Sequence, residues 1–160
     1  MLTQTSETAI QALIYLSRRE QNSPISPREI AEALDASPTY MAKIARMLVK
    51  ANILRSHRGA MGGVTLSRRA ADINLLEIVE ACQGMLIGNY CDSMSGHVEP
   101  VCGFHTAMVE IHHATINVLK KWSLEKMATC PKRKAGTGSE PPCKMALALS
   151  LELAGINGRK

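Results

Sequence analysis

Two helix starts of the same kind follow each other closely, and together they limit what the chain can fold into. Serine precedes proline at Ser26 and Pro27 and again at Ser37 and Pro38. Serine is a preferred N-cap and proline is tolerated in the first helical turn, so each pair predicts the beginning of a helix. The segment "ISPREIAEALDA" contains the first pair and ends just before the second, so it has room only for a short helix. Two short helices joined by a tight turn are typical of a helix-turn-helix unit, and an ordinary helical hairpin is the alternative.

Further helices are expected on either side of this turn. The segment "SETAIQALIYLSRRE" has its apolar residues on one helical face and Ser6 as a candidate N-cap. After the second serine and proline, "TYMAKIARMLVKANIL" has Met41, Ile44, Leu48 and Ile53 at helical spacing. The sequence therefore predicts three successive helices, of which the second is short.

A glycine-rich hairpin is expected directly after the third helix. The segments "ILRSH" and "GVTLSR" have the character of two short strands around "RGAMGG". Gly59, Gly62 and Gly63 would allow a tight turn, with Arg58 at its tip. This order predicts a winged helix-turn-helix, in which the third helix can enter the major groove of DNA and the hairpin lies on phosphates or reaches the minor groove.

The distribution of charge favours a polyanionic partner. The 160-residue chain has a formal net charge of +5, and no Asp or Glu occurs between Ala36 and Ala71. The basic residues of that segment are Lys43, Arg46, Lys50, Arg55, Arg58, Arg68 and Arg69. An acid-free basic segment favours nucleic acid, and a solvated charged face is the alternative.

Composition excludes several classes of protein. No apolar run approaches the roughly 18 residues that a membrane helix needs, and the N-terminus lacks the features of a secretion signal. We therefore expect a cytoplasmic protein without a membrane partner, whose five cysteines are thiols, metal ligands or redox groups. No phosphate-binding loop or evident oxyanion cradle is present, so we do not expect an enzyme.

A second helical region is expected after the wing. Asn74 can cap "LLEIVEACQ", on which Cys82 lies toward the apolar side as a core thiol. A loop, "GMLIGNYCDSMSGHVEPVCG", then leads to a long helix, "FHTAMVEIHHATINVLKKWSLEKMA". Its apolar positions alternate three and four residues apart, at Phe104, Met108, Ile111, Thr115, Val118 and Trp122. This spacing is a seam for a partner helix, and packing against the helix's own domain is the alternative.

The run "ISPREIAEALDASPTYMAKIARMLVKANILRSHRGAMGGVTLSRRAADINLLEIVEACQG" resembles the Rrf2 family of bacterial transcription regulators. "SPxY" at the recognition helix, "RGxxGG" in the wing and "INLLEIVEA" in the following helix are typical of that family. The resemblance covers roughly residues 1 to 128. It implies a homodimer that binds near-palindromic operators in double-stranded DNA and senses iron–sulfur status, nitric oxide, redox state or a metabolite.

The resemblance also implies the DNA contacts. Thr39, Tyr40 and Lys43 would face the bases from the recognition helix, and Arg58 would enter the minor groove from the wing. The other candidates are phosphate contacts or part of the wing turn: Ser37, Arg55 and Gly59. For Tyr40, a partly buried packing role is the alternative.

Ligand chemistry is concentrated in "CDSMSGHVEPVCGFH", which holds Cys91, His97, Cys102 and His105. Cluster-binding Rrf2 members usually carry three cysteines in this loop, with a fourth ligand from a histidine or from an acidic residue in the partner's first helix. Glu7 aligns with that acidic position. The middle cysteine is missing here, and His97 lies near its place. The alternatives are a [2Fe–2S] cluster, a zinc site, or no metal.

Two further cysteines, Cys130 and Cys143, flank a loop rich in Lys, Gly and Pro, ahead of an expected final helix, "CKMALALSLELAG". They are extra ligands, a reversible redox pair, or incidental. Without a metal, the chain would be a thiol-redox or small-molecule-responsive regulator, or a DNA-binding adaptor with no sensory role.

The expected fold is mainly α, with a small β-hairpin wing. Its parts are a winged helix-turn-helix domain over 1–83, a sensor loop over 84–103, a dimerisation helix over 104–128, and a C-terminal loop and helix over 129–160.

Overall fold

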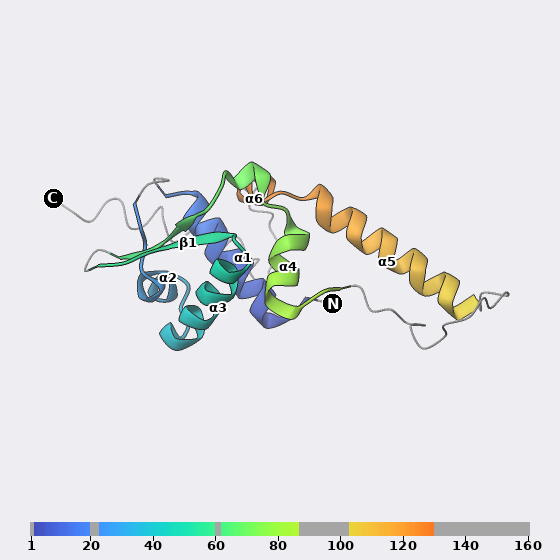
Figure 1. The fold of residues 1–160 in the computed structure, drawn as a ribbon, viewed down its shortest axis with the longest axis horizontal. Coiled ribbons are helices and arrows are strands. Elements are labelled where there is room, and N and C mark those ends of the chain that lie inside the picture. The colour runs from blue at the N-terminus through green and yellow to red at the C-terminus, as the bar shows by residue number, and fades with distance from the viewer. Residues whose placement is uncertain (1, 20–22, 60–61, 87–102, 130–160) are drawn as a thin grey trace, which may run out of the picture.

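A computed structural model describes residues 2–19, 23–59, 62–86 and 103–129 of the chain (Figure 1). Some predictions lie outside these residues, namely those for the final helix over 143–155 and for Cys91, His97, Cys102, Cys130 and Cys143. Within the described residues, the elements follow in the order α1 (Gln4–Ser17), α2 (Pro27–Ala33), α3 (Pro38–Lys50), β1 (Leu54–His57), β2 (Gly63–Leu66), η1 (Ala70–Asp72), α4 (Leu75–Gln83), α5 (Gly103–Lys121) and α6 (Leu124–Ala128). None of these helices is long and apolar enough to cross a bilayer. The mainly α fold with one hairpin is confirmed.

The helix starts follow the capping residues of the sequence, with one correction. Ser26 caps α2, since its side chain accepts a hydrogen bond from the backbone N–H of Glu29 at 3.1 Å. Ser6 does not cap α1, because the helix begins earlier, at Gln4, and its N-cap is Thr3, whose Oγ1 accepts from the Ser6 N–H at 3.2 Å. Ser6 is instead a fully buried residue inside the first turn.

The third helix is shorter than its apolar pattern predicts. It ends at Lys50, and Asn52 has a positive φ of 57°, a left-handed conformation that asparagine tolerates better than most residues. Ile53 is buried, as expected, but it lies in the turn that enters β1 and is not part of the helical face. The sharp end of α3 therefore sets where the wing begins.

The wing is an antiparallel pair attached to the segment before α2. Leu54 pairs with Leu66 and His57 pairs with Gly63. On the other edge of β2, Ile25 forms an isolated bridge to Val64, with N···O distances of 3.1 and 2.9 Å. A Cβ atom at Gly63 would lie 2.5 Å from the backbone of Ile25, so this approach requires glycine. The base of the wing is thereby fixed to the helix-turn-helix.

One apolar core joins most of the helices. Leu13 of α1, Ile30 of α2, Ile44 of α3, Ile78 of α4 and Leu124 of α6 are all buried in it. Figure 1 shows α1 running behind α3 and α4, while α5 projects away from this body. Of the described α-helices, α5 contributes no residue to the core cluster.

The expected single helix over 104–128 is two helices, so that part of the prediction is wrong. The backbone leaves the helix at Trp122 because it pairs with the chain ahead of α4. The Leu75 N–H donates to the Trp122 carbonyl at 2.8 Å, and the Leu124 N–H donates to the Ile73 carbonyl at 2.8 Å. Ser123 then caps α6. The break returns the chain to the core and leaves α5 extending from it.

Candidate nucleic-acid interface

The recognition helix α3 has two distinct faces. Its apolar face, with Met41, Ile44, Ala45 and Leu48, is buried against the core. The opposite stripe is exposed and follows the helical spacing of four, three and four residues, at Thr39, Lys43, Arg46 and Lys50. The apolar face holds the helix in place, and the polar stripe is presented to solvent.

The hairpin carries a second set of exposed basic groups. Arg55 and Arg58 are exposed. Gly59 follows with a φ of 112°, a backbone conformation that residues with a side chain rarely adopt. Figure 1 shows the hairpin extending from the body beside α2 and α3. Glycine at this position therefore lets the chain turn directly after Arg58, as the sequence predicts.

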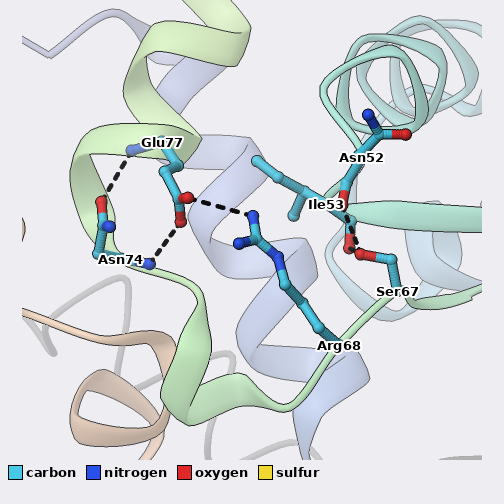
Figure 2. A network of polar contacts seen from close by, with 6 residues as sticks. All are labelled: Asn52, Ile53, Ser67, Arg68, Asn74 and Glu77. Atoms are coloured by element: carbon cyan, nitrogen blue, oxygen red, sulfur yellow. Dashed lines mark hydrogen bonds and ion pairs between the residues drawn. The ribbon is translucent and has the colours of Figure 1, made fainter.

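A polar network at the base of the wing fixes its orientation (Figure 2). Ser67, which follows β2, donates through Oγ to the carbonyls of Asn52 and Ile53, the latter at 3.1 Å. Arg68 donates to Glu77 Oε1 at 3.2 Å. The other Glu77 oxygen accepts from the backbone N–H of Asn74 at 3.0 Å, which completes the capping box of α4. The end of the wing is thus bonded to the end of α3 and to the start of α4.

Most cations of the acid-free segment have no carboxylate partner among the residues that the structure describes. Arg68 pairs with Glu77, and Arg69 pairs with Asp72 at 2.8 Å, which lowers the pKa of the Asp72 carboxyl. Among the described residues, no carboxylate lies within ion-pair distance of Lys43, Arg46, Lys50, Arg55 and Arg58. These five groups belong to α3 and the wing, and their charge is available to an external anion.

The stripe on α3 and the wing share one side of the molecule. Ala42, Arg46 and Lys50 line one wall of an open groove, and Ser56 and His57 of β1 contribute to the other. Arg46 and Lys50 were not among the residues singled out as DNA contacts from the sequence. The helical period that continues from Lys43 is the signal that identifies them.

Tyr40 is placed differently from Thr39 and Lys43. It is half-buried against the core, and its hydroxyl donates to Oγ1 of Thr5 at 3.0 Å. These contacts favour the packing alternative for Tyr40. Ser37 is exposed, and its side chain makes no capping bond to α3. The Ser37 hydroxyl therefore makes no hydrogen bond to the first turn of α3, whereas the Tyr40 hydroxyl is bonded to Thr5.

The first turn of α1 is bonded to the end of α4. Ser6 Oγ donates to Gln83 Oε1 at 3.0 Å, and the backbone N–H of Thr3 donates to the same oxygen at 3.3 Å. Glu7 is exposed on this turn. Gln83 is the last residue of α4, so the contact lies just ahead of the predicted sensor loop. Sequence reasoning missed it because its partners are far apart in the chain.

The predicted metal ligands are only partly within the described residues. Glu7 lies on α1, and His105 belongs to the first turn of α5, while Cys91, His97 and Cys102 are outside. No group of three metal-ligating side chains occurs in the part of the chain that the structure describes. The structure therefore leaves the proposed ligand set untested.

Cys82 has the environment of a core thiol. It is half-buried beside the core, and burial raises its pKa to about 11. A thiol with so high a pKa is almost entirely protonated at neutral pH, when it is a weak nucleophile and a poor ligand.

The helix-turn-helix buries its apolar face in the core, exposes a basic stripe and is followed by a basic wing. These features together define a DNA-binding protein of the winged-helix class. The chain belongs to the Rrf2 family, whose model, described as an iron-dependent transcriptional regulator, matches residues 2–129. It is a transcriptional regulator and not an enzyme.

The chain is also similar to a curated relative in sequence and to two solved structures in fold. YwgB of Bacillus subtilis (strain 168), named as an HTH-type transcriptional regulator, is 32% identical over 122 residues, which are 74% of this chain and 78% of that protein. The structure of CymR, the global cysteine regulator of B. subtilis, has a TM-score of 0.67 at 22% identity and covers 82% of this chain and 98% of its own. T. potens IscR has a TM-score of 0.66 at 24% identity, with coverages of 85% and 93%. Both structures share the fold of this chain.

Proposed function

We propose that this regulator acts as a homodimer on a near-palindromic operator in double-stranded DNA. The observation that carries the proposal is the exposed stripe of α3 beside the wing, with five cations that lack carboxylate partners among the described residues. Two such surfaces related by a two-fold axis match the symmetry of a palindromic site.

Within each protomer, the side chains divide into three roles. Thr39 and Lys43 face the bases, because they lie on the exposed stripe near the N-terminus of α3. Arg58 enters the minor groove from the wing tip, where Gly59 allows the turn. The phosphate contacts are Ser37 and Arg55. We assign Tyr40 a positioning role, since its hydroxyl is bonded to Thr5.

The dimer forms through α5. This helix projects from the body, and its seam is exposed at Phe104, Ile111 and Val118, with exposed fractions of 66%, 57% and 57%. Trp122, 42% exposed, directly follows the helix. Large apolar side chains at alternating spacings of three and four residues match the packing of two helices against each other. A second copy of α5 offers the same seam and would bury both.

The regulator senses redox or iron–sulfur status through the loop before α5. Cys91 and Cys102, with ligands from His97, His105 and the partner's Glu7, have the donor chemistry of a [2Fe–2S] cluster with mixed thiolate and nitrogen or oxygen ligation. When bound, the cluster supplies a reversible one-electron redox couple. The same donors suit zinc.

The position of Glu7 supports a link between this loop and DNA. Glu7 is on the turn of α1 that bonds Tyr40 of α3 through Thr5 and Gln83 of α4 through Ser6. A ligand held at Glu7 would therefore bias the position of α3. A bias of about 1–3 kcal/mol changes DNA occupancy by severalfold to about a hundredfold.

DNA binding is tested with Arg58→Ala. A duplex selected from a random-sequence pool by the wild-type protein serves as the probe, and its affinity is measured by fluorescence anisotropy. Loss of a minor-groove arginine should weaken binding roughly tenfold or more. Lys120→Ala, on the exposed part of α5, is the matched control and should bind normally. An unchanged affinity for Arg58→Ala would discard the wing contact.

Sensing is tested on protein purified without oxygen, by absorption spectroscopy with iron, sulfide and zinc analysis. A cluster predicts absorption between about 320 and 500 nm that disappears in Cys102→Ala and persists in Cys82→Ser, the control at a core thiol. Colourless protein with zinc would indicate the zinc site. Colourless, metal-free protein would refute both metals and direct the test to Cys130 and Cys143, or to a regulator without a sensory role.

A further inference from the structure

A cavity of about 250 Å³ lies between the end of α1, the segment before α2 and strand β2. The described residues that line it are Leu16, Arg19, Ser23, Ile25 and residues 64–69. None of these lining residues comes from α3, and none is one of the five cations on which the proposed DNA contact rests. The cavity is therefore a feature separate from the DNA-binding surface.

Part of the lining is apolar. Leu16, Ile25 and Val64 line the cavity and are buried members of the core. Ser23 and Thr65 add hydroxyl groups. Apolar walls with a few polar groups are typical of small-molecule sites, and a volume of about 250 Å³ lies just below the range for drug-sized ligands. The cavity therefore suits a small molecule with a hydrocarbon part.

The charged groups of the lining are all positive. Arg19, Arg68 and Arg69 line the cavity, and none of the described lining residues is Asp or Glu. Arg68 bonds Glu77 and Arg69 bonds Asp72, and Figure 2 shows Arg68 directed toward Glu77. A guanidinium has five N–H donors, so one that bonds a protein oxygen can also bind an anion. This lining favours an acid over a neutral or basic ligand.

Strand β2 adds a backbone donor. Val64 exchanges both of its backbone hydrogen bonds with Ile25, so its N–H and carbonyl face away from β1. Alternate residues of a strand face the same edge, so the N–H and carbonyl of Leu66 also face away from β1, whereas the Ser67 N–H bonds Ile53. Among the described residues, Leu66 has no backbone partner on this outer edge, and it lines the cavity. Its N–H can therefore donate to a bound carboxylate.

We propose that this cavity binds a small organic acid, with the carboxylate at Arg19 and the Leu66 N–H and the hydrocarbon part against the apolar lining. Arg19 suits this role because its guanidinium is held in place. It lies 4.9 Å from the centroid of the Tyr15 ring and donates to the Tyr15 hydroxyl at 2.8 Å. Tyr15 is itself buried in the core, so the cation is positioned before a ligand binds.

The bound acid acts as an effector of DNA binding. Ser67 and Arg68 line the cavity, and they bond the end of α3 and the start of α4, which fixes the base of the wing. A ligand that shifts either side chain changes how the wing is held. This step rests on the DNA-binding function proposed above, whereas binding of the acid does not. By linkage, the acid and DNA change each other's affinity by the same factor.

Isothermal titration calorimetry tests the site on the full-length protein without DNA. The probes are acetate, butyrate and isovalerate, the neutral amide isovaleramide, and inorganic phosphate. Affinity should rise about fourfold for each CH₂ group added to acetate, and isovalerate should bind with a dissociation constant of about 1 mM or lower. Isovaleramide should bind at least tenfold more weakly. If no carboxylate binds, or if phosphate binds as tightly as isovalerate, the proposal is overturned.

A matched pair of variants tests the position of the carboxylate. Arg19→Met removes the charge and keeps an unbranched side chain beside Tyr15, and it should weaken isovalerate binding about tenfold or more. Arg28→Met removes the same charge from the exposed side of α2, outside the lining, and should bind isovalerate as the wild type does. Circular dichroism verifies that both variants fold. Wild-type affinity in Arg19→Met would overturn the proposal.

Fluorescence anisotropy with the selected duplex tests the effector role. Saturating isovalerate should change the DNA affinity of the wild type by about threefold or more and should leave that of Arg19→Met unchanged. Binding of isovalerate without any change in DNA affinity would refute the effector role. If Arg19→Met weakens DNA binding without acid, and DNA displaces isovalerate, the cavity holds a DNA phosphate and the proposal is overturned. If the wild type binds no duplex at all, the proposed function fails, while calorimetry still decides whether the cavity binds the acid.

Discussion

The hydroxyl of Tyr40 donates a hydrogen bond to Oγ1 of Thr5 at 3.0 Å, joining the start of α3 to the start of α1. Both side chains are half-buried, so the bond is largely shielded from water. The next residue of α1, Ser6, is bonded to the end of α4. The first turn of α1 therefore contacts both the recognition helix and the helix that precedes the predicted sensor loop.

Tyr40→Phe and Thr5→Val test this contact as a pair. Each should lower the free energy of unfolding by about 0.5–1.5 kcal/mol, because each removes one half-buried hydrogen bond. Their effects should not add in the double variant, which a double-mutant cycle of urea unfolding measures. A positioning role predicts an unchanged base preference for Tyr40→Phe. If Tyr40→Phe instead alters base preference and leaves unfolding unchanged, the hydroxyl reads a base.

The attachment of the wing predicts unequal effects of two glycine substitutions. Gly63→Ala would place a Cβ atom 2.5 Å from the backbone of Ile25, where only backbone movement can relieve the clash. We expect it to lower the free energy of unfolding by about 1–3 kcal/mol. Gly103→Ala, at the open start of α5, meets no atom within 4 Å and should change it by less than about 0.5 kcal/mol. Equal effects in urea unfolding would contradict the close approach.

The Cys82 thiol predicts a specific dependence on pH. Burial raises its pKa to about 11, so alkylation by iodoacetamide in the folded protein should be slow at neutral pH and should accelerate as pH approaches that value. Unfolded protein should react faster at neutral pH, because an exposed thiol has a pKa of about 8.5. Peptide mass spectrometry reports the rate at each cysteine. The same rate at Cys82 in folded and unfolded protein would contradict its burial.

The linked effect on stability has a definite sign. Folding raises the pKa of Cys82, so the contribution of this thiol to the free energy of unfolding is constant below the pKa of the unfolded state. This contribution is lost as pH rises toward about 11, because the thiol of the unfolded protein ionises at a lower pH than that of the folded protein. Cys82→Ser should remove this part of the alkaline loss of stability.

The parts of the fold that local chemistry specifies could be predicted from the sequence. Ser26 and Asn74 cap their helices through bonds to residues three positions later, so the signal is contained in one helical turn. The break at Trp122 could not be predicted, because it depends on pairing with Ile73 and Leu75, which are distant in the chain. The prediction that Ser6 caps α1 is wrong because Thr3 is the N-cap, and the bond of Ser6 to Gln83, 77 residues away, has no local signal either.

The candidate site divides in the same way. Thr39 and Lys43 lie where their spacing on α3 indicates, and the turn at Gly59 follows from glycine alone. The contact of Tyr40 with Thr5 carries no local signal, because a tyrosine on a helix edge can face either solvent or a neighbouring helix. Arg46 had the required spacing, but its place in a groove depends on where the wing lies.

The surface of α5 gives the clearest expectation for assembly. Phe104, Ile111 and Val118 repeat every seven residues and are more than half exposed. Fully burying one such side chain is worth about 1.5–3 kcal/mol. A two-fold interface would bury the same three side chains on both protomers. Exposed apolar side chains in this regular arrangement are costly in water unless a partner covers them.

Ile111→Asp should therefore disrupt the proposed dimer and leave monomers. It removes an apolar contact and places a charge in the seam of both protomers, which should raise the dimer dissociation constant by about two orders of magnitude or more. Asn117→Asp adds the same charge to the same helix away from the seam and should leave the dimer intact. Sedimentation equilibrium measures both, and helix content by circular dichroism verifies that the variants fold. A wild-type monomer, or a dimer that tolerates Ile111→Asp, would mean that α5 does not form the interface.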